Sequence, residues 1–162
     1  MDEIRLKPIG VIRSPFKDPR GAPIQATNGQ GVRGFAEVFE EYAEGLDDLD
    51  GFSHVVLICH LHLARQTNLK VTPFLDTVLR GVFSTRAPSR PNHLGLTIAR
   101  LVRIEGNTLH LEDLDIVDGT PLLDIKPYVP RLDQRQGAKL GWLEGKTSEF
   151  TRGLADDRFT RD

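Results

Sequence analysis

The sequence is almost without cysteine and has no long apolar run, and each of these shortages excludes a class of protein. It has one cysteine, Cys59, and no apolar run that approaches a membrane span, which needs about 18 consecutive apolar residues. A lone cysteine excludes a disulfide framework and a cysteine-based zinc cluster, and it suits a reducing compartment. The first ten residues are too charged for a secretory signal. We therefore expect a cytoplasmic protein that does not enter a membrane.

The chain has 162 residues, 39% of them hydrophobic and 27% charged, which is enough for one domain with a real core, or one domain plus a tail. The formal net charge of −2 excludes a strongly basic protein. The charge is nevertheless segregated. Residues 35–50 contain seven acids and no base, whereas residues 76–103 contain five arginines and one acid, Asp76. Such an arginine-rich band either binds phosphates or a carboxylate, or is a solvated surface.

Ten prolines and fifteen glycines divide the chain into short elements. Hydrophobic patterning predicts strands at 4–13, 54–63, 81–85, 96–105 and 108–114. Gly106-Asn107 predicts a two-residue hairpin turn between the last two. Residues 14–34 form a long loop, of a kind that is usually functional or mobile, and residues 134–162 read as a polar extension that needs a partner to be ordered.

Segment 35–49 allows two interpretations. Phe35, Val38, Phe39, Tyr42 and Leu46 recur at helical spacing, which favours an amphipathic helix. A short strand at 35–39 followed by one helical turn fits as well.

Two patterns that often mark sites are weak here. Residues 29–34 spell G-x-G-x-x-G, but no strand leads into them as a dinucleotide site requires, so the glycines more simply permit a turn. His60 and His62 point to one side of the predicted strand 54–63, yet a zinc site needs a third ligand that no motif supplies. We therefore predict no metal.

Three stretches have the character of a built site: residues 81–95 (GVFSTRAPSRPNHLG), 115–121 (DIVDGTP) and 124–128 (DIKPY). In each, proline stiffens a turn that presents charged side chains. Rigid loops that carry Arg, Asn, Asp and Lys commonly bind a polar, charged small molecule.

With residues 9–16 (IGVIRSPF) and 49–54 (LDGFSH), these stretches resemble the TsaA-like (YaeB-like) family over about residues 7–130. Members of that family are tRNA methyltransferases that methylate N6 of threonylcarbamoyladenosine at position 37. The resemblance implies a mainly β fold, a compact antiparallel β-barrel with short helical turns, in a homodimer that binds S-adenosyl-L-methionine without a Rossmann domain. It also implies a strand at 35–39. Together with the change to polar composition after Asp133, it predicts a barrel domain at 1–133 and a C-terminal extension at 134–162.

Carried over by position, the resemblance also predicts the site. The cofactor contacts fall on Ala26, Thr27, Asn28, His62, Leu63, Arg86, Leu96, Glu112, Asp113, Leu114 and Asp115. The substrate, the anticodon loop of a tRNA, is assigned to Arg90, Asn92, Lys126 and Tyr128. Two positions depart from the family pattern: Ile24 stands where the family commonly has arginine, and His93 where it has proline.

The acceptor N6 must lose its proton during or near methyl transfer, so a base helps. The candidate bases are Asp118 and His62, which the sequence does not rank, and Lys126 or Arg90 would orient the threonyl carboxylate. Three other functions remain open: methylation of another small acceptor, cofactor binding without catalysis, and RNA binding alone through the arginine band.

Overall fold

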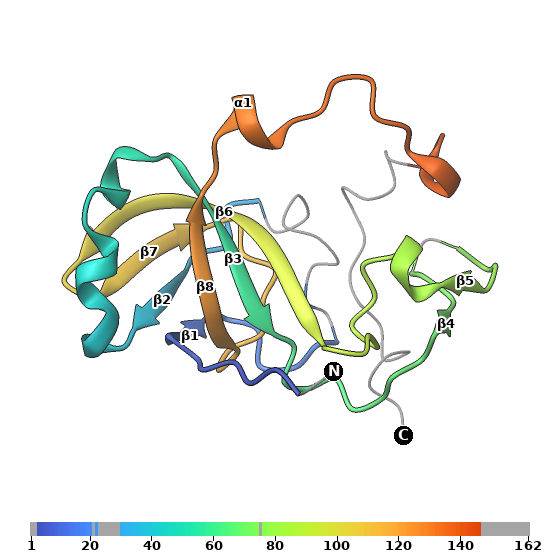
Figure 1. Ribbon diagram of the computed structural model, residues 1–162, viewed down its shortest axis with the longest axis horizontal. Helices are drawn as coiled ribbons and strands as arrows, with labels where there is room; N and C mark the ends of the chain where they lie inside the picture. The colour runs from blue at the N-terminus through green and yellow to red at the C-terminus, as the bar shows by residue number, and fades with distance from the viewer. Residues whose placement is uncertain (1–2, 21, 23–29, 75, 147–162) are drawn as a thin grey trace.

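The computed structural model describes residues 3–20, 22, 30–74 and 76–146, and its centre is a closed barrel of six antiparallel strands (Figure 1). The order around the barrel is β1-β2-β7-β6-β3-β8. Closure removes the unpaired strand edges that an open sheet would leave. The strands are β1 (Gly10–Arg13), β2 (Gly34–Val38), β3 (His54–His60), β6 (Leu94–Glu105), β7 (Thr108–Glu112) and β8 (Pro121–Pro127). The predicted antiparallel β-barrel is confirmed.

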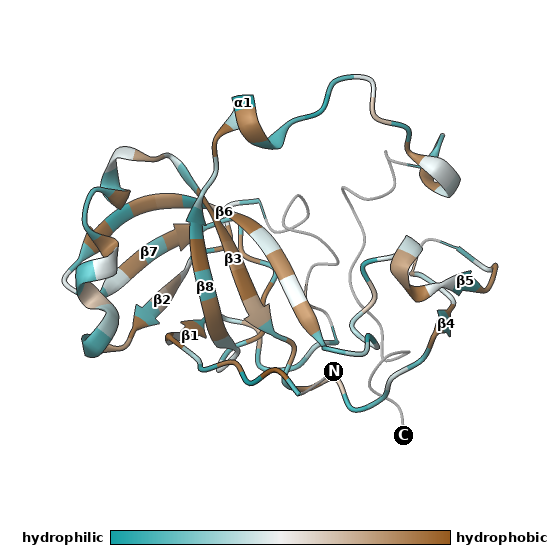
Figure 2. Cartoon of the chain, in the orientation of Figure 1, coloured by the Kyte–Doolittle hydropathy of each residue, from teal (hydrophilic) through white to brown (hydrophobic). Residues whose placement is uncertain are grey.

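The core fills the interior of the barrel, because successive side chains of a strand point to opposite faces. On β3 the buried Val55, Leu57 and Cys59 alternate with half-buried neighbours. Leu109 and Leu122 complete the same cluster from β7 and β8. Figure 2 shows the apolar β3 and β6 in the barrel and the hydrophilic stretch that follows α1 (Pro130–Asp133).

Segment 35–49 adopts the second of its two interpretations. Residues 34–38 form β2, which pairs with β1 and β7, and the chain then turns through two short 3-10 helices, η2 (Glu40–Leu46) and η3 (Leu49–Gly51). The helical spacing arises because Leu46 and Leu49 are buried against the barrel core from these turns. Tertiary pairing therefore overrides the helical pattern.

Other boundaries differ from the sequence prediction. β1 begins only at Gly10, and the predicted strand 81–85 is wrong: β5 (Arg80–Gly81) ends at once in the 3-10 helix η4 (Val82–Ser84). β8 was not predicted, because its terminal prolines read as turns; they stand at the two ends of the strand, where proline is tolerated. The hairpin is confirmed: Glu105 pairs with Thr108, and Gly106 has φ +58°.

Between the paired strands β3 and β6 the chain leaves the barrel and then returns to it. We call residues 61–74 and 76–93 the insertion lobe; it contains β4 (Lys70–Val71), β5 and η4. The C-terminal extension passes from α1 to η5 (Gly141–Leu143), which lies against this lobe. There the indole nitrogen of Trp142 donates a hydrogen bond to the carbonyl oxygen of Ser84 over 2.8 Å.

Two glycines mark where strands approach most closely. A Cβ built on Gly10 would lie 2.3 Å from the carbonyl oxygen of Glu37, and one built on Gly34 would lie 2.3 Å from that of Arg13. Both belong to the β1–β2 pair. The described part of the chain has no helix that could cross a bilayer.

Candidate active site

One end of the barrel collects most of the predicted cofactor residues. Strands β1, β3 and β7 end there, and β2, β6 and β8 begin there. His62 and Leu63 follow β3 at this end, and Glu112 closes β7. We call it the lobe end, since the insertion lobe leaves and re-enters the barrel there. Ala26, Thr27, Asn28 and Ile24 lie outside the described residues.

The segment after β7 crosses the lobe end and closes it. Leu114 and Ile116 are buried in the core cluster, so the backbone between them lies over the barrel mouth. Asp113 adopts φ +64° and its Oδ1 accepts a hydrogen bond from the backbone nitrogen of Gly31 at 2.8 Å. This segment therefore places Asp113 and Asp115 at the lobe end and fastens Asp113 to Gly31.

At this end the charge of the Glu112 carboxylate is balanced by two arginines, and the Cys59 thiol is uncharged. The Glu112 carboxylate, with 14% of its side chain exposed, pairs with Arg33 at 2.9 Å and with Arg100 at 2.8 Å. Burial, together with the nearby charge of Asp115, raises the pKa of the Cys59 thiol to about 12. A thiol with such a pKa stays protonated and is neither a nucleophile nor a metal ligand at neutral pH.

At this end, His62 has a ring nitrogen with unused hydrogen-bonding capacity. Its Nδ1 atom is buried and has no hydrogen-bond partner among the residues that the structure describes. Burial, and to a smaller degree the charge of His60, lowers the pKa of the ring. His62 is therefore neutral at neutral pH, and a neutral imidazole with a bare nitrogen can accept a proton.

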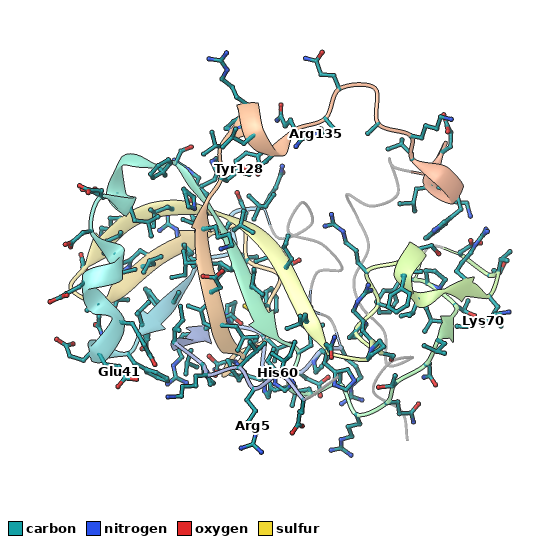
Figure 3. The ribbon with its side chains drawn as sticks, viewed as in Figure 1. Arg5, Glu41, His60, Lys70, Tyr128 and Arg135 are labelled. Atoms are coloured by element: carbon teal, nitrogen blue, oxygen red, sulfur yellow. The ribbon has the colours of Figure 1, made fainter. Side chains whose placement is uncertain are left out.

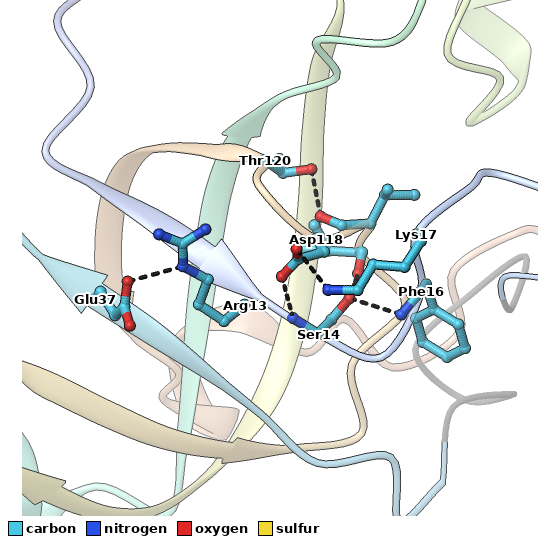
Figure 4. A network of polar contacts seen from close by, with 9 residues as sticks. Arg13, Ser14, Phe16, Lys17, Glu37, Asp118 and Thr120 are labelled. Carbon is cyan, nitrogen blue, oxygen red and sulfur yellow. Dashed lines mark hydrogen bonds and ion pairs between the residues drawn. The ribbon is translucent and has the colours of Figure 1, made fainter.

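Asp118, the other candidate base, is held in a network of polar contacts (Figure 4). Its Oδ1 accepts a hydrogen bond from the backbone nitrogen of Ser14 at 3.1 Å, and its Oδ2 forms an ion pair with the Lys17 ammonium at 2.7 Å. The Ser14 hydroxyl in turn donates to the carbonyl of Ile116. The Lys17 contact is the main cause that lowers the pKa of Asp118. A carboxylate so engaged fastens the end of β1 to the turn before β8 and is a poor proton acceptor.

The predicted substrate residues are spread over the molecule. The Arg90 guanidinium is turned inward: its Nη1 donates to the carbonyls of Thr85 at 2.8 Å and Val82 at 3.3 Å. Asn92 is exposed in the turn before β6. Lys126 stands opposite Val56 on the outer barrel wall. Tyr128 lies at the opposite end of the barrel from His60, edge-on to His54 at 6.2 Å (Figure 3).

Arg86 and Leu96 complete the predicted set. Arg86 is exposed in the insertion lobe, just after η4. Leu96 is 54% exposed and stands opposite Ile58, so it faces outward from the barrel wall. The barrel mouth thus has one part of the predicted site, and the outer wall has another.

Comparison with known proteins identifies the family to which this barrel belongs. Residues 11–134 match the family model of the tRNA-methyltransferase O N-terminal domain. The chain belongs to this family. A solved relative, TrmO from Pseudomonas aeruginosa, has 36% sequence identity and a TM-score of 0.74 over 87% of this chain and 63% of its own.

Two curated relatives are also similar in sequence to this chain. A probable S-adenosyl-L-methionine-binding protein of Pyrococcus abyssi is 49% identical over 153 residues, 94% of this chain and 83% of that protein. A tRNA (adenine(37)-N6)-methyltransferase of Mus musculus is 38% identical over 137 residues, 80% of this chain and 32% of that protein. The chain thus spans less than two thirds of the solved TrmO chain and about a third of the mouse protein.

Sequence reasoning missed one cluster, which joins the insertion lobe to the C-terminal extension. The Asp76 carboxylate, 4% exposed, accepts from Arg80 at 2.7 Å and from Lys146 at 3.1 Å, and its pKa is held well below its ordinary range chiefly by Arg80. Trp142 lies beside both cations, with its ring centre 5.2 Å from the Arg80 guanidinium carbon. The lone acid among five arginines was the one available signal, because a single buried carboxylate can hold several cations.

Proposed function

We propose that this chain is an S-adenosyl-L-methionine-dependent methyltransferase that acts on N6 of threonylcarbamoyladenosine at position 37 of tRNA in the cytoplasm. The observation that supports it best is His62 at the lobe end, a neutral histidine whose buried Nδ1 has no hydrogen-bond partner among the described residues. The names of the relatives supply the chemistry: one binds S-adenosyl-L-methionine and another methylates adenine 37 of tRNA.

The residues of the lobe end fit this cofactor. The buried Nδ1 of His62 lacks a partner among the described residues, which is the state expected of a group that contacts a ligand. Asp113 and Asp115, carried by the crossing segment, suit ribose hydroxyls and a sulfonium cation, and the exposed Arg86 suits the methionine carboxylate. Bound S-adenosyl-L-methionine would supply an electrophilic methyl group there.

His62 would take the proton that the acceptor amine loses. The N6 lone pair of a threonylcarbamoylated adenine is delocalised, so the amine reacts only as its proton leaves. His62 is neutral because burial lowers its pKa, and nothing in the described part of the chain is hydrogen-bonded to its Nδ1. Asp118 is engaged by Ser14 and Lys17, so we assign proton acceptance to His62 and a positioning role to Asp118.

The proposed function is tested by calorimetric titration with S-adenosyl-L-methionine, with ATP as the control ligand, followed by a methyl-transfer assay. We expect saturable binding of S-adenosyl-L-methionine alone, and methylation of tRNA that carries threonylcarbamoyladenosine in preference to the same tRNA without that modification. Equal binding of ATP would contradict the cofactor assignment. Cofactor binding with no methylation of the modified tRNA would contradict the acceptor assignment.

We further propose that the protein is a homodimer formed through the outer wall of β3 and β6. This dimer face consists of Val56, Ile58, Leu94, Leu96 and Ile98; Val56 pairs with Ile98 and Ile58 with Leu96 across the two strands. Leu94, Leu96 and Ile98 are 39%, 54% and 37% exposed. A continuous apolar face of this kind commonly marks an interface. Because Leu96 is a predicted cofactor contact, a second copy seated here would complete the cofactor site.

A charge placed in the dimer face tests this assembly. We expect Ile98→Glu to convert the dimer to a monomer in light scattering at micromolar concentration and to weaken cofactor binding. Val102→Glu is the matched control: Val102 is 45% exposed on the same strand but lies beyond the residues that pair with β3. A monomeric wild-type protein, or equal effects of both variants, would contradict the proposed interface.

A further inference from the structure

Phe83 is the most exposed aromatic side chain in the described part of the chain, and the proposed site leaves it without a role. Its ring is 74% exposed at the centre of η4, within the GVFSTR motif. Its neighbour Val82 is 1% exposed and anchors the turn in the small core of the insertion lobe with Val71 and Ala87. The turn therefore has a buried side that stabilises it and a solvent side that presents the phenyl ring.

The backbone around Phe83 is fixed from several directions. The Ser84 hydroxyl donates to the carbonyl of Gly81 at 2.8 Å, and the Thr85 hydroxyl donates to that of Val82, also at 2.8 Å. The carbonyl of Ser84 accepts a hydrogen bond from the indole nitrogen of Trp142. The guanidinium of Arg90 donates hydrogen bonds to the carbonyls of Val82 and Thr85. An exposed ring on a backbone held so firmly is a pre-organised contact, which loses little conformational entropy on binding.

The charge of the insertion lobe indicates the kind of partner. The lobe contains five bases, namely Arg65, Lys70, Arg80, Arg86 and Arg90, against one acid, Asp76. Asp76 is neutralised by Arg80 and Lys146. The guanidinium carbon of Arg90 lies 5.9 Å from the centre of the Phe83 ring. An aromatic ring amid positive charge is the arrangement with which proteins bind single-stranded nucleic acid, whose bases stack while its phosphates are attracted.

We propose that Phe83 is a stacking platform for an unpaired RNA base next to the nucleotide that is modified. The proposal rests on the proposed function for the identity of the RNA, an anticodon loop. The lobe joins the barrel directly after β3 and directly before β6, so Phe83 belongs to the part of the chain that extends outward from the lobe end. Stacking of a neighbouring base would hold the loop while the target base reaches His62 at the lobe end.

The test compares Phe83 variants in binding an anticodon stem-loop that carries 2-aminopurine beside position 37. With wild-type protein we expect quenching of the fluorescence, because stacking quenches 2-aminopurine. Phe83→Ala should weaken binding about 10-fold or more and abolish the quenching, Phe83→Leu should behave like Phe83→Ala, and Phe83→Tyr should restore both. Leu69→Ala is the matched control, since Leu69 is 67% exposed in the same lobe but has no ring.

Each other outcome is informative. Affinity for S-adenosyl-L-methionine and the dependence of RNA binding on salt should stay as in wild type, because the ring contacts neither cofactor nor phosphate. Full affinity of Phe83→Ala or Phe83→Leu would overturn the proposal, as would loss of the dimer in Phe83→Ala, which would assign the ring to a protein interface. Ring-dependent RNA binding without methyl transfer would leave the proposal standing and overturn the proposed function instead.

Discussion

Gly34→Ala is expected to prevent closure of the barrel. The new methyl group would lie 2.3 Å from the carbonyl oxygen of Arg13 and 2.6 Å from Cδ1 of Leu114. The first contact is with backbone of the paired strand, which moves only if β1 and β2 separate, and the second is with a core residue of the segment that crosses the barrel mouth. We expect a loss of about 3 kcal/mol or more in the free energy of unfolding, measured by urea denaturation.

Gly45→Ala is the matched control for this substitution. Gly45 lies in η2, and none of the described atoms comes within 4 Å of a Cβ built there. Because alanine also restricts the unfolded chain more than glycine does, we expect this variant to be as stable as wild type or slightly more stable. If Gly34→Ala matches Gly45→Ala in stability, β1 and β2 are not in close contact at Gly34.

His62→Ala is expected to show the largest catalytic effect. If Nδ1 accepts the proton of the acceptor amine, removing it should lower kcat about 100-fold or more at saturating cofactor and tRNA, with thermal stability close to wild type. In the wild-type protein the rate should rise with pH and level off above the lowered pKa of His62, since only the neutral ring accepts a proton. His62→Gln, which retains a polar side chain without a proton-accepting nitrogen, should be as slow as His62→Ala.

Asp118→Asn is the comparison variant for His62. It keeps the shape of the side chain but loses the charge paired with Lys17, so we expect a stability loss of about 1 kcal/mol and a much smaller loss of kcat. The wild-type contribution of Asp118 is present above the ordinary carboxylate pKa and disappears as pH falls through the lowered pKa of the folded state. A kcat loss for Asp118→Asn as large as that of His62→Ala would reverse the assignment.

The sequence predicted the barrel through its motifs, and it predicted the central strands through their alternation. It did not predict which face of β6 is buried. Leu96, Ile98 and Val102 form the apolar row that the sequence displays, yet this row faces outward, whereas Thr97, Ala99 and Leu101 are buried. Two of the inner positions of β6, Thr97 and Ala99, have small or polar side chains, and larger residues of the other strands fill the interior. Hydrophobicity alone therefore marks the outer face more strongly than the inner one.

The arrangement of the candidate site could not be predicted from the sequence. The motifs pointed to Asp118 and His62 as equal candidates, and only the contacts of Ser14 and Lys17 with Asp118 separate them. The sequence predicts a ligand-binding role for Arg90, but its Nη1 donates hydrogen bonds to backbone carbonyls of its own loop. These roles depend on where a turn places neighbouring carbonyls and amides, which residue spacing does not encode.

The contact between Trp142 and Ser84 changes how the insertion lobe can move relative to the barrel. Two chain connections, at Leu61 and His93, lie side by side and are joined by a backbone hydrogen bond, so alone they would act as a hinge about which the lobe swings. The extension leaves the barrel at the far end of β8 and reaches the lobe at η5. The extension is a third connection, placed away from that hinge. Three connections that do not lie on one line fix the orientation of the lobe relative to the barrel. The described part of the extension, in which no residue is buried, thereby sets the angle between the lobe and the barrel.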